Sequence, residues 1–412
     1  MSGKLTGRAS REAPGALAGL RVLDLSRVLA GPWCSQLLAD LGAEVIKVER
    51  PGRGDDTRSW GPPFLGSPDA GLSAYFLSTN RNKRSVAIDF KHPEGAGLVR
   101  RLAATSDVLI ENFRPGALGR CGLDYDSLHA VKPDLVYCSI TGFGQTGPDR
   151  DRGGYDLLIQ AMGGLMSVTG EADSEPMKVG VALTDVITDL YAVTGILAAL
   201  RHRDAAGKGQ HIDLALLDVQ VAALANQALN YLMSGWPPVR LGNAHPNIVP
   251  YQAFAARDGH LILAVGNDGQ FRDFCAVAGC PELADDPRFA TNAGRVEHRE
   301  ELLARLEPLI AARGRDEWIA ALECAGVPCG PVHNLTEVFS NPQVKARGMH
   351  FSLDSEDGAV PQVANPLHLS ATPPVYRKAP PCLGADTRAV LSELVGLGKV
   401  ERDALKNSGV IQ

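Results

Sequence analysis

The sequence lacks the charge pattern of a nucleic-acid-binding protein and the long apolar run of a membrane span. The formal net charge is −6, and the 41 basic and 47 acidic residues are interspersed, so no basic patch marks a nucleic-acid partner. No apolar stretch reaches the roughly 18 uncharged residues that cross a bilayer. The most apolar segment, 179–200, contains Asp185 and Asp189. We therefore expect neither a nucleic acid nor a membrane as a partner.

The sequence also lacks a metal-ligand pattern and a secretory signal. Its 8 cysteines are scattered, and the pairs closest together, Cys275/Cys280 and Cys324/Cys329, do not have C-x-x-C spacing. No histidine pair completes a zinc site, so we expect reduced thiols and no metal. Residues 1–16 have no hydrophobic centre. We interpret them as a flexible tail, with a short transit segment as the alternative.

A glycine motif at 142–147, GFGQTG, matches G-x-G-x-x-G after an apolar run. This pattern binds a dinucleotide only where a helix begins at the third glycine and an acidic residue follows about twenty positions later. Pro148 and a polar segment follow instead, and the acidic residue is missing. We therefore expect a tight loop leaving a sheet rather than a dinucleotide site.

The order of apolar segments predicts an α/β fold. Compact apolar strands are separated by helix-sized segments, which indicates a parallel, doubly wound, Rossmann-like sheet. The expected strands are 21–26, 44–50, 85–90, 107–113, 134–142 and 209–218. Loops that join strands to helices in such a sheet line a ligand crevice.

The length of 412 residues favours two domains. We expect a large domain over 17–205, a linker over 206–229, a smaller α+β domain over 230–330, and a return to the large domain over 331–412. The segment 184–203 has helical spacing, with Thr184 as a fair N-cap. Further helices are expected at 297–313, 315–325 and 384–396.

Asp185 is the informative carboxylate because it lies in the first turn of this mostly apolar helix. Its simplest role is that of a capping charge. Its functional alternative is that of a nucleophile toward an activated acyl group. Asp189 follows one turn later on the same face, and two dry carboxylates would oppose each other's ionisation. We therefore expect Asp189 to reach solvent or a cation.

Several stretches together form a pattern that is typical of one protein family. They are LDLSRVLAGPWCSQLLADLGAEVIKVERPGRGDDTRSWGPPF, LSTNRNKRSVAIDF, ENFRPGAL, YCSITGFGQTGP, GYD, VGVALTD and GKGQHIDLALLD. From about residue 17 to the C-terminus, the chain resembles the family III CoA-transferases, the formyl-CoA and carnitine CoA-transferase group. RLGNAHPNIVPYQAF and VPCGPVHN look most similar to succinate–hydroxymethylglutarate CoA-transferase, which moves CoA between dicarboxylic acids.

The resemblance implies a large Rossmann-like domain built from both ends of the chain, a small domain, and an interlocked homodimer. It implies that Asp185 attacks the donor thioester to form a mixed anhydride and then an aspartyl-CoA thioester. It implies CoA and acyl-CoA as substrates, with no metal or redox cofactor. The implied CoA-binding positions are Val28, Ala30, Arg50, Asn112, Phe113 and Arg120, with Tyr155 near the reacting centre. The implied substrate loop, 241–246, contains Gly242, Asn243 and His245.

The chain departs from the family pattern at several positions. Asp189 stands where many members have glycine, and Leu29 stands where formyl-CoA transferases have glutamine. A formate or oxalate role is therefore disfavoured, and Arg27 is a candidate for binding a distal carboxylate. We expect succinyl-CoA as donor, a short dicarboxylic acid as acceptor, and a cytoplasmic location, or the mitochondrial matrix in a eukaryote.

Two alternatives stay open at this point. The same fold carries α-methylacyl-CoA racemases, whose catalytic histidine lies in a GHD motif. Here the motif is Gly154-Tyr155-Asp156, and tyrosine is a poor base at neutral pH. The second alternative is a CoA-binding regulator without catalysis, which the intact Asp185 motif disfavours.

Overall fold

The computed structural model describes residues 15–67 and 72–412. The expected tail over 1–16 lies almost wholly outside the described residues. The chain forms two compact units. The first comprises Met1–Gly164, Gly180–Ala225 and Lys345–Gln412, and the second comprises Leu165–Val179 and Asn226–Val344.

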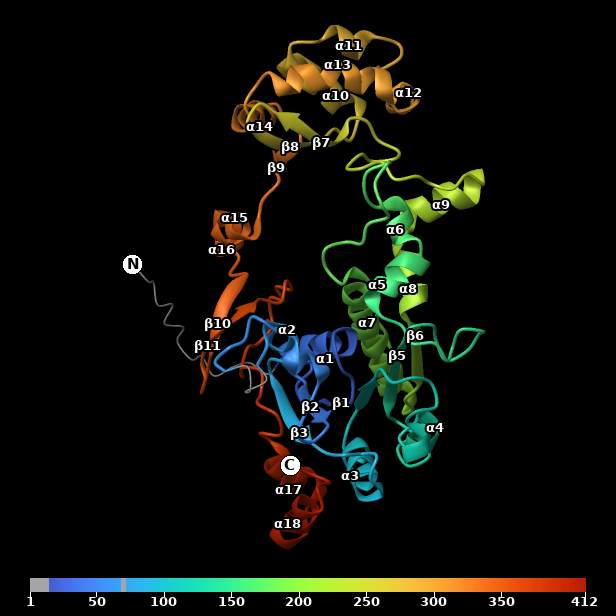
Figure 1. Ribbon diagram of the computed structural model, residues 1–412, viewed down its shortest axis with the longest axis vertical. Coiled ribbons are helices and arrows are strands. Elements are labelled where there is room, and N and C mark those ends of the chain that lie inside the picture. Colours follow the sequence, from blue (N-terminus) through green and yellow to red (C-terminus); the bar gives the residue numbers. More distant parts are fainter. Residues whose placement is uncertain (1–14, 68–71) are drawn as a thin grey trace. The chain divides into compact units, whose positions relative to one another are not determined.

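A six-stranded parallel sheet is the centre of the first unit (Figure 1). The strand order is β3-β2-β1-β4-β5-β6, and every pairing is parallel. The strands are β1 (Arg21–Asp24), β2 (Glu44–Glu49), β3 (Lys83–Ala87), β4 (Val108–Glu111), β5 (Val136–Thr141) and β6 (His211–Ala215). The predicted α/β fold with a parallel Rossmann-like sheet is confirmed.

Two helical layers cover this sheet because its strands are apolar on both faces, as expected of parallel strands. One face packs on α1 (Ala30–Asp40), α5 (Asp156–Met162), α7 (Leu183–Ala206) and α8 (Leu216–Ala223). The other face packs on α3 (Pro93–Ala104), α4 (Tyr125–His129), α17 (Thr387–Val395) and α18 (Lys399–Asn407). The chain end returns to the sheet, where Ile411 bridges Ile88.

Helix α7 is long and apolar enough to cross a membrane, judged by length and composition alone. Its Ala192, Ile196 and Leu200 pack with α1 residues such as Leu38 in the core of the first unit. We therefore interpret α7 as a core helix of the sheet layer.

The strand order places a topological switch between β1 and β4, because the chain runs outward in opposite directions from these two neighbours. In doubly wound sheets, ligands bind outside the carboxyl ends of the strands at this switch. The turns that follow β1 and β4 are therefore the first place to look for a site.

The unit boundaries differ from the expected domains. Residues 206–229 are not a linker, because β6 pairs with β5 from Tyr137↔His211 to Thr141↔Ala215 and α8 packs on the same sheet. The segment 165–179 belongs to the second unit, as does 331–344. The helix expected at 384–396 is followed by α18, which begins after Gly396 and Gly398.

The remaining short elements of the first unit lie in its connections. They are η1 (Asp56–Ser59), α2 (Ala74–Ser78), η3 (Gly119–Cys121) and the hairpin β10 (His350–Ser355)–β11 (Gly358–Val363).

The second unit has its own antiparallel sheet and core. The sheet order is β7-β8-β9, from Tyr251–Ala256, Gly259–Ala264 and Cys329–Pro331. Its core includes Phe254, Phe274, Trp318 and Leu322. Its helices are α6 (Leu165–Val168), α9 (Ala225–Ser234), α10 (Asp268–Ala278), α11 (Glu282–Asp285), α12 (Asn292–Glu297), α13 (Arg299–Ala311), α14 (Arg315–Cys324), α15 (Leu335–Ser340) and α16 (Pro342–Ala346), with Ala225 and Lys345–Ala346 on the first unit's side of the division.

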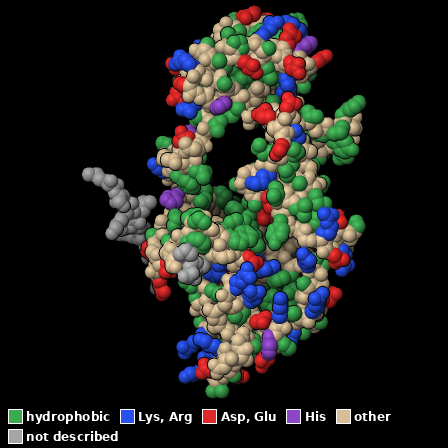
Figure 2. All heavy atoms as spheres, in the orientation of Figure 1, with side chains coloured by type: hydrophobic (Ala, Val, Ile, Leu, Met, Phe, Trp, Pro, Cys, Tyr) green, Lys and Arg blue, Asp and Glu red, His purple; other side chains and the backbone are tan. Residues whose placement is uncertain are grey.

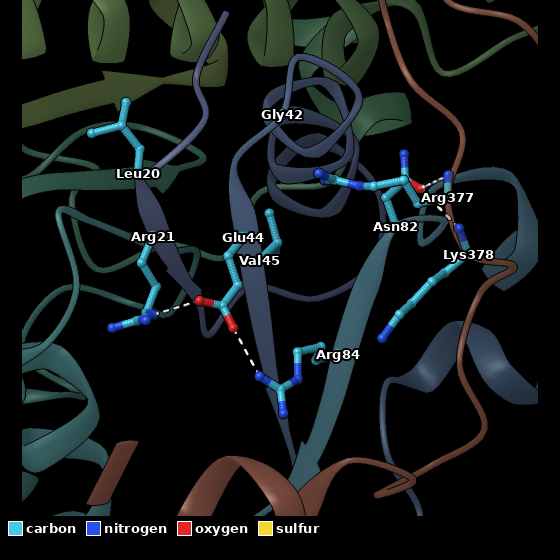
Figure 3. Close-up of a pocket in the computed structure, with 10 residues that line it drawn as sticks. Leu20, Arg21, Gly42, Glu44, Val45, Asn82, Arg84, Arg377 and Lys378 are labelled. Carbon is cyan, nitrogen blue, oxygen red and sulfur yellow. Dashed lines mark hydrogen bonds and ion pairs between the residues drawn. The ribbon is translucent and has the colours of Figure 1, made fainter. Parts of the chain in front are cut away.

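A cavity of about 320 Å³ lies at the amino ends of β1, β2 and β3 (Figure 3). Its arginines already have protein partners. Glu44 pairs with Arg21 and Arg84 at 2.8 Å each, and Arg377 donates to the carbonyl oxygens of Ala39, in α1, and Ala43, just before β2. Asn82 Oδ1 accepts the Arg377 N–H at 2.7 Å. The cavity lies at the strand ends opposite the switch, and we assign its contacts to holding the C-terminal segment on the sheet.

The glycine motif forms a loop, as predicted. Strand β5 ends at Thr141, and the next helix, α5, begins only at Asp156. Gly142 and Gly154 touch through their main chains, because a Cβ built on Gly142 would lie 2.6 Å from the Gly154 Cα. The two ends of the loop are thus clamped together, and this closure sets the start of α5.

Candidate active site

The turn between β1 and α1 is bound to the turn after β4. Asn112 accepts the Arg27 N–H at 2.9 Å and donates to the Arg27 carbonyl oxygen at 2.6 Å. Val28 has a φ of 74°, a left-handed conformation that is unusual for a β-branched residue. The Arg27 guanidinium lies 5.3 Å from the centre of the Phe113 ring. The structure therefore brings Arg27, Val28, Asn112 and Phe113 together at the topological switch.

Asp185 lies at the start of α7, on the face of the sheet that α1 also covers. Ala182 holds the N-cap position and has no side-chain acceptor, so Thr184 is not the N-cap. Asp156, at the start of α5, accepts the Thr184 N–H at 2.9 Å instead. This bond ties the loop that contains Tyr155 to the turn that contains Asp185.

Asp185 is half-buried. Burial, and then the nearby charge of Asp156, raise the pKa of Asp185 to about 7. A carboxylate with a raised pKa is a stronger nucleophile than an ordinary one, and with a pKa of about 7 roughly half of the Asp185 groups are ionised at neutral pH. The burial and the charge environment of Asp185 are therefore those expected of a carboxylate nucleophile.

Asp189 does not reach solvent or a cation, so that prediction is wrong. Its residue is 1% exposed, and neither carboxyl oxygen makes a hydrogen bond of ordinary geometry within residues 15–67 and 72–412. Burial, and then the charge of Asp185, raise its pKa to about 8, although the neighbouring Leu190 N–H acts in the opposite direction. The cause of the error is α1, whose buried Cys34 lies within electrostatic reach of Asp189. At neutral pH Asp189 is therefore a protonated acid.

Sequence reasoning missed Tyr75, on α2. Burial, and then the charges of Asp185, Asp156 and Asp55, raise the pKa of Tyr75 to about 12. The charges of Asp185, Asp156 and Asp55 thus all act on this tyrosine, and at neutral pH it keeps its phenolic proton. No sequence signal marked it, because these groups come from four separate segments.

A second cavity, of about 190 Å³, adjoins the turn after β4. Glu111 lines it, accepts the Phe113 N–H at 2.8 Å and has its pKa raised to about 7, chiefly by burial. Ser139 and His211 lie beside it, with 2.9 Å between Oγ and Nε2. Glu111 therefore shapes the same turn that presents Asn112.

The other predicted CoA-binding residues are not all linked to the β1 turn by the described contacts. Ala30 and Leu29 are buried at the start of α1. Arg50, after β2, and Arg120, in η3, are exposed, as is Tyr155, 70% of whose surface is accessible. The described contacts do not join Arg50 or Arg120 to the turn that holds Val28.

The predicted substrate loop belongs to the second unit. Gly242 has a φ of 59° and donates its N–H to the Gly170 carbonyl oxygen at 3.0 Å, and Asn243 is exposed. His245 packs against Tyr251, and burial followed by the Arg299 charge lowers its pKa. At neutral pH His245 is therefore uncharged.

A family model described as CoA-transferase family III matches residues 17–387. The chain belongs to this family and is a CoA-transferase.

Its relatives include transferases for dicarboxylic acids. The chain is 53% identical, over 95% of its length and 98% of the relative, to the succinate–glutarate CoA-transferase of Agrobacterium fabrum. It is 43% identical, over 96% of its length and 90% of the relative, to the human succinyl-CoA:glutarate CoA-transferase.

Solved structures agree with the fold. A CAIB/BAIF family protein from Brucella suis is 51% identical, with a TM-score of 0.81 over 93% of this chain and 100% of that one. Rv3272 from Mycobacterium tuberculosis is 30% identical, with a TM-score of 0.81 over 92% of this chain and 99% of that one.

Proposed function

We propose that the protein transfers CoA from succinyl-CoA to a short dicarboxylic acid, with glutarate as the first candidate. The observation that carries this proposal is the 53% identity, over nearly the full length of both chains, to a succinate–glutarate CoA-transferase. The pair of carboxylic acids is chemically matched, since both are short chains with a second carboxylate. Formate and oxalate are poorer candidates because Leu29 is apolar and buried.

In the proposed mechanism, the Asp185 carboxylate attacks the thioester carbonyl of succinyl-CoA. The carbon–sulfur bond breaks, CoA leaves as a thiolate, and a succinyl–aspartyl anhydride forms. The thiolate then attacks the Asp185 carbonyl, which releases succinate and leaves an aspartyl-CoA thioester. The acceptor carboxylate attacks that thioester, and the released thiolate attacks the new acyl group. Acyl-CoA leaves, and Asp185 is regenerated.

The roles of the surrounding residues follow from their positions. We assign acyl-CoA binding to Val28, Ala30, Asn112 and Phe113 at the switch. Arg50 and Arg120 are exposed cations that suit the phosphates of CoA, and Tyr155 lies next to Asp156, which positions the start of α7. For the loop with Gly242, Asn243 and His245, we keep the proposal that it covers the acyl group. No bound metal or redox group takes part in these proposed steps.

Arg27 is our candidate for binding the distal carboxylate of a dicarboxylic acid. Its guanidinium is exposed and pairs with Asp56 at 2.9 Å, so a substrate carboxylate would replace or share that partner. Replacing Arg27 with alanine should raise the KM for glutarate about tenfold and leave the KM for a monocarboxylic acid nearly unchanged. An unchanged KM for glutarate would remove Arg27 from the site.

An interlocked homodimer is also part of the proposal. Apolar side chains are exposed on both units, among them Leu190 and Tyr191 on α7, and Leu232, Met233 and Trp236 on or just after α9. Figure 2 shows hydrophobic side chains gathered on the protruding surface at α9. Large exposed apolar patches are typical of protein–protein interfaces. For location, we keep the cytoplasm, or the mitochondrial matrix in a eukaryote, as a proposal.

The experiment is an acceptor panel. Purified protein is incubated with succinyl-CoA and glutarate, hydroxymethylglutarate, itaconate, malate, oxalate or formate, and new acyl-CoA is measured by liquid chromatography. We expect glutaryl-CoA to form, and Asp185→Asn to lower its rate at least about a thousandfold. Absence of any new acyl-CoA from the panel would contradict the proposed function.

A further inference from the structure

The turn after β1 holds a valine in a conformation that valine disfavours. Val28 has a φ of 74°, and a β-branched residue at positive φ is an outlier. Such strain persists only where surrounding contacts over-determine it, and it is concentrated at active sites and ligand clamps. Here it occurs at the topological switch, between the ends of β1 and β4.

Two side chains from different segments fix this turn. Asn112 binds both main-chain groups of Arg27, and Asp55 accepts the Val28 N–H, with 3.3 Å to each carboxyl oxygen. The peptide groups just before Val28 are thus anchored to the end of β4 and to the segment after β2. The strained residue sits between these two anchors.

Asp55 is itself locked by a buried ion pair. Its carboxylate lies 2.9 Å from Lys47 Nζ, and both side chains are 0% exposed. Lys47 also donates to the Ser26 carbonyl oxygen at 2.9 Å, and Asp55 accepts the Thr57 N–H at 3.0 Å. Burial alone would raise the pKa of Asp55, but the charge of Lys47 and the hydrogen bonds from Lys47 and Thr57 lower it, so Asp55 is ionised.

The simpler explanation is that the Lys47–Asp55 pair only stabilises the fold. A comparison is available in the Asp40–Arg81 pair, which is also buried, with 2.6 Å between its charged atoms. Asp40 likewise bonds a residue of positive φ, Asn82, but that residue is an asparagine, which tolerates the left-handed conformation. Of these two pairs, the Lys47–Asp55 pair is therefore the one that holds a main-chain amide in a conformation that its residue resists.

We propose that Asp55, locked by Lys47, is a positioning residue for acyl-CoA, because it keeps the main chain of Val28 to Ala30 in the shape that receives the ligand. The inference rests on the proposed function, which places CoA at this turn. Asp55 touches no reacting atom in this account. It acts through the conformation of Val28.

The test measures the affinity of coenzyme A by calorimetry and the KM values of succinyl-CoA and glutarate. Lys47→Met with Asp55→Ala removes the acceptor without leaving half of the pair buried and unpaired. We expect the Kd of coenzyme A and the KM of succinyl-CoA to rise about tenfold, because the turn then leaves its strained shape. The KM of glutarate should change less than about twofold.

A rescue variant separates positioning from stability. Glycine adopts a φ near 74° without strain, so adding Val28→Gly to that double variant should return the Kd to within about threefold of the original value. The matched control, Arg81→Met with Asp40→Ala, should lower the melting temperature and leave the Kd unchanged. Val28→Pro, which fixes a negative φ and leaves the buried pair intact, should weaken coenzyme A binding at least about tenfold.

Each outcome decides the matter. An unchanged Kd in the folded Lys47/Asp55 variant, or a raised Kd that Val28→Gly fails to restore, overturns the inference. If the Lys47/Asp55 variant does not fold, tight binding by Val28→Pro overturns it, and weakened binding supports it. Failure of the unaltered protein to bind coenzyme A at all would instead refute the proposed function.

Discussion

Among single residues, Asp185 has a carboxyl pKa raised to about 7, so its ionised fraction increases as the pH rises through neutrality. The proposed nucleophile is the ionised form. We therefore expect kcat/KM for succinyl-CoA to fall about tenfold per pH unit below about 7 and to level off above it. A pH–rate profile measures this directly.

Two neighbouring acids make this profile diagnostic. Asp156 adds to the raised pKa of Asp185, so Asp156→Asn should move the midpoint to lower pH while keeping an acceptor for the Thr184 N–H. Asp189→Asn should leave the midpoint in place, because burial and Asp156 are what raise the pKa of Asp185. A midpoint that moves with Asp189 and not with Asp156 would contradict this electrostatic account.

The raised pKa of Asp189 also makes the stability of the protein depend on pH. Its pKa rises from 3.8 to about 8 on folding, so the folded state binds this proton more tightly than the unfolded state. Stability from this group is present below about pH 4 and is lost as the pH rises toward about 8. Asp189→Asn should therefore raise the melting temperature by about 3 °C or more at pH 8 and by little at pH 4, measured by calorimetry. An equal gain at both pH values would show that Asp189 is not protonated as described.

The sequence was sufficient to predict Asp185 as the informative carboxylate, because its place in a first helical turn depends on local pattern. The environment of Asp189 could not be predicted, since α1 buries it from about 150 positions away in the chain. Tyr75 and Asp55 were missed for the same reason. Asp185 and Asp156 are more than 80 positions from Tyr75, and Val28 is 27 positions from Asp55, so local spacing carries no record of these contacts.

Among elements, the loop between β5 and α5 depends on the contact of Gly142 with Gly154. A Cβ on Gly154 would lie 2.4 Å from the Gly142 Cα, and neither main chain can move without shifting α5. Gly154→Ala should therefore cost about 1–3 kcal/mol of stability and lower activity by displacing Asp156. Thermal unfolding and the transferase assay measure both effects.

Gly180→Ala is the matched control, because a Cβ at Gly180 meets no atom within 4 Å. The two variants should differ in melting temperature by several degrees, on the order of 2–4 °C per kcal/mol. If Gly154→Ala is as stable and active as Gly180→Ala, the loop closure does not set the start of α5.

The strands of the large unit were predicted well because parallel strands are compact apolar runs with clear ends. The strand at 209–218 was expected, but the residues 206–229 around it were assigned wrongly as a linker, because the sequence does not show which strand β6 pairs with. What makes β6 part of the sheet is its pairing with β5, a long-range contact. The short insertion of 165–179 into the second unit is likewise fixed by contacts such as the Gly242 N–H to Gly170.

For the whole molecule, the exposed apolar residues of α9 predict assembly. Leu232 is 73% exposed and Met233 is 85% exposed, so replacing both with aspartate places two charges on this apolar surface, and dimer formation during expression should fall sharply. Val400→Asp, at an apolar residue 82% exposed on α18, is the control and should leave the dimer intact. Light scattering after size-exclusion chromatography measures the mass. A monomeric unaltered protein would refute the proposed dimer.

The most direct measurement for the central proposal is to trap the acylated nucleophile. The protein is incubated with succinyl-CoA, treated with hydroxylamine, digested and analysed by mass spectrometry. A hydroxamate or a chain break at Asp185, absent when Asp185 is replaced by asparagine, is the predicted result. An unmodified Asp185 in protein that is transferring CoA would contradict covalent catalysis by this carboxylate.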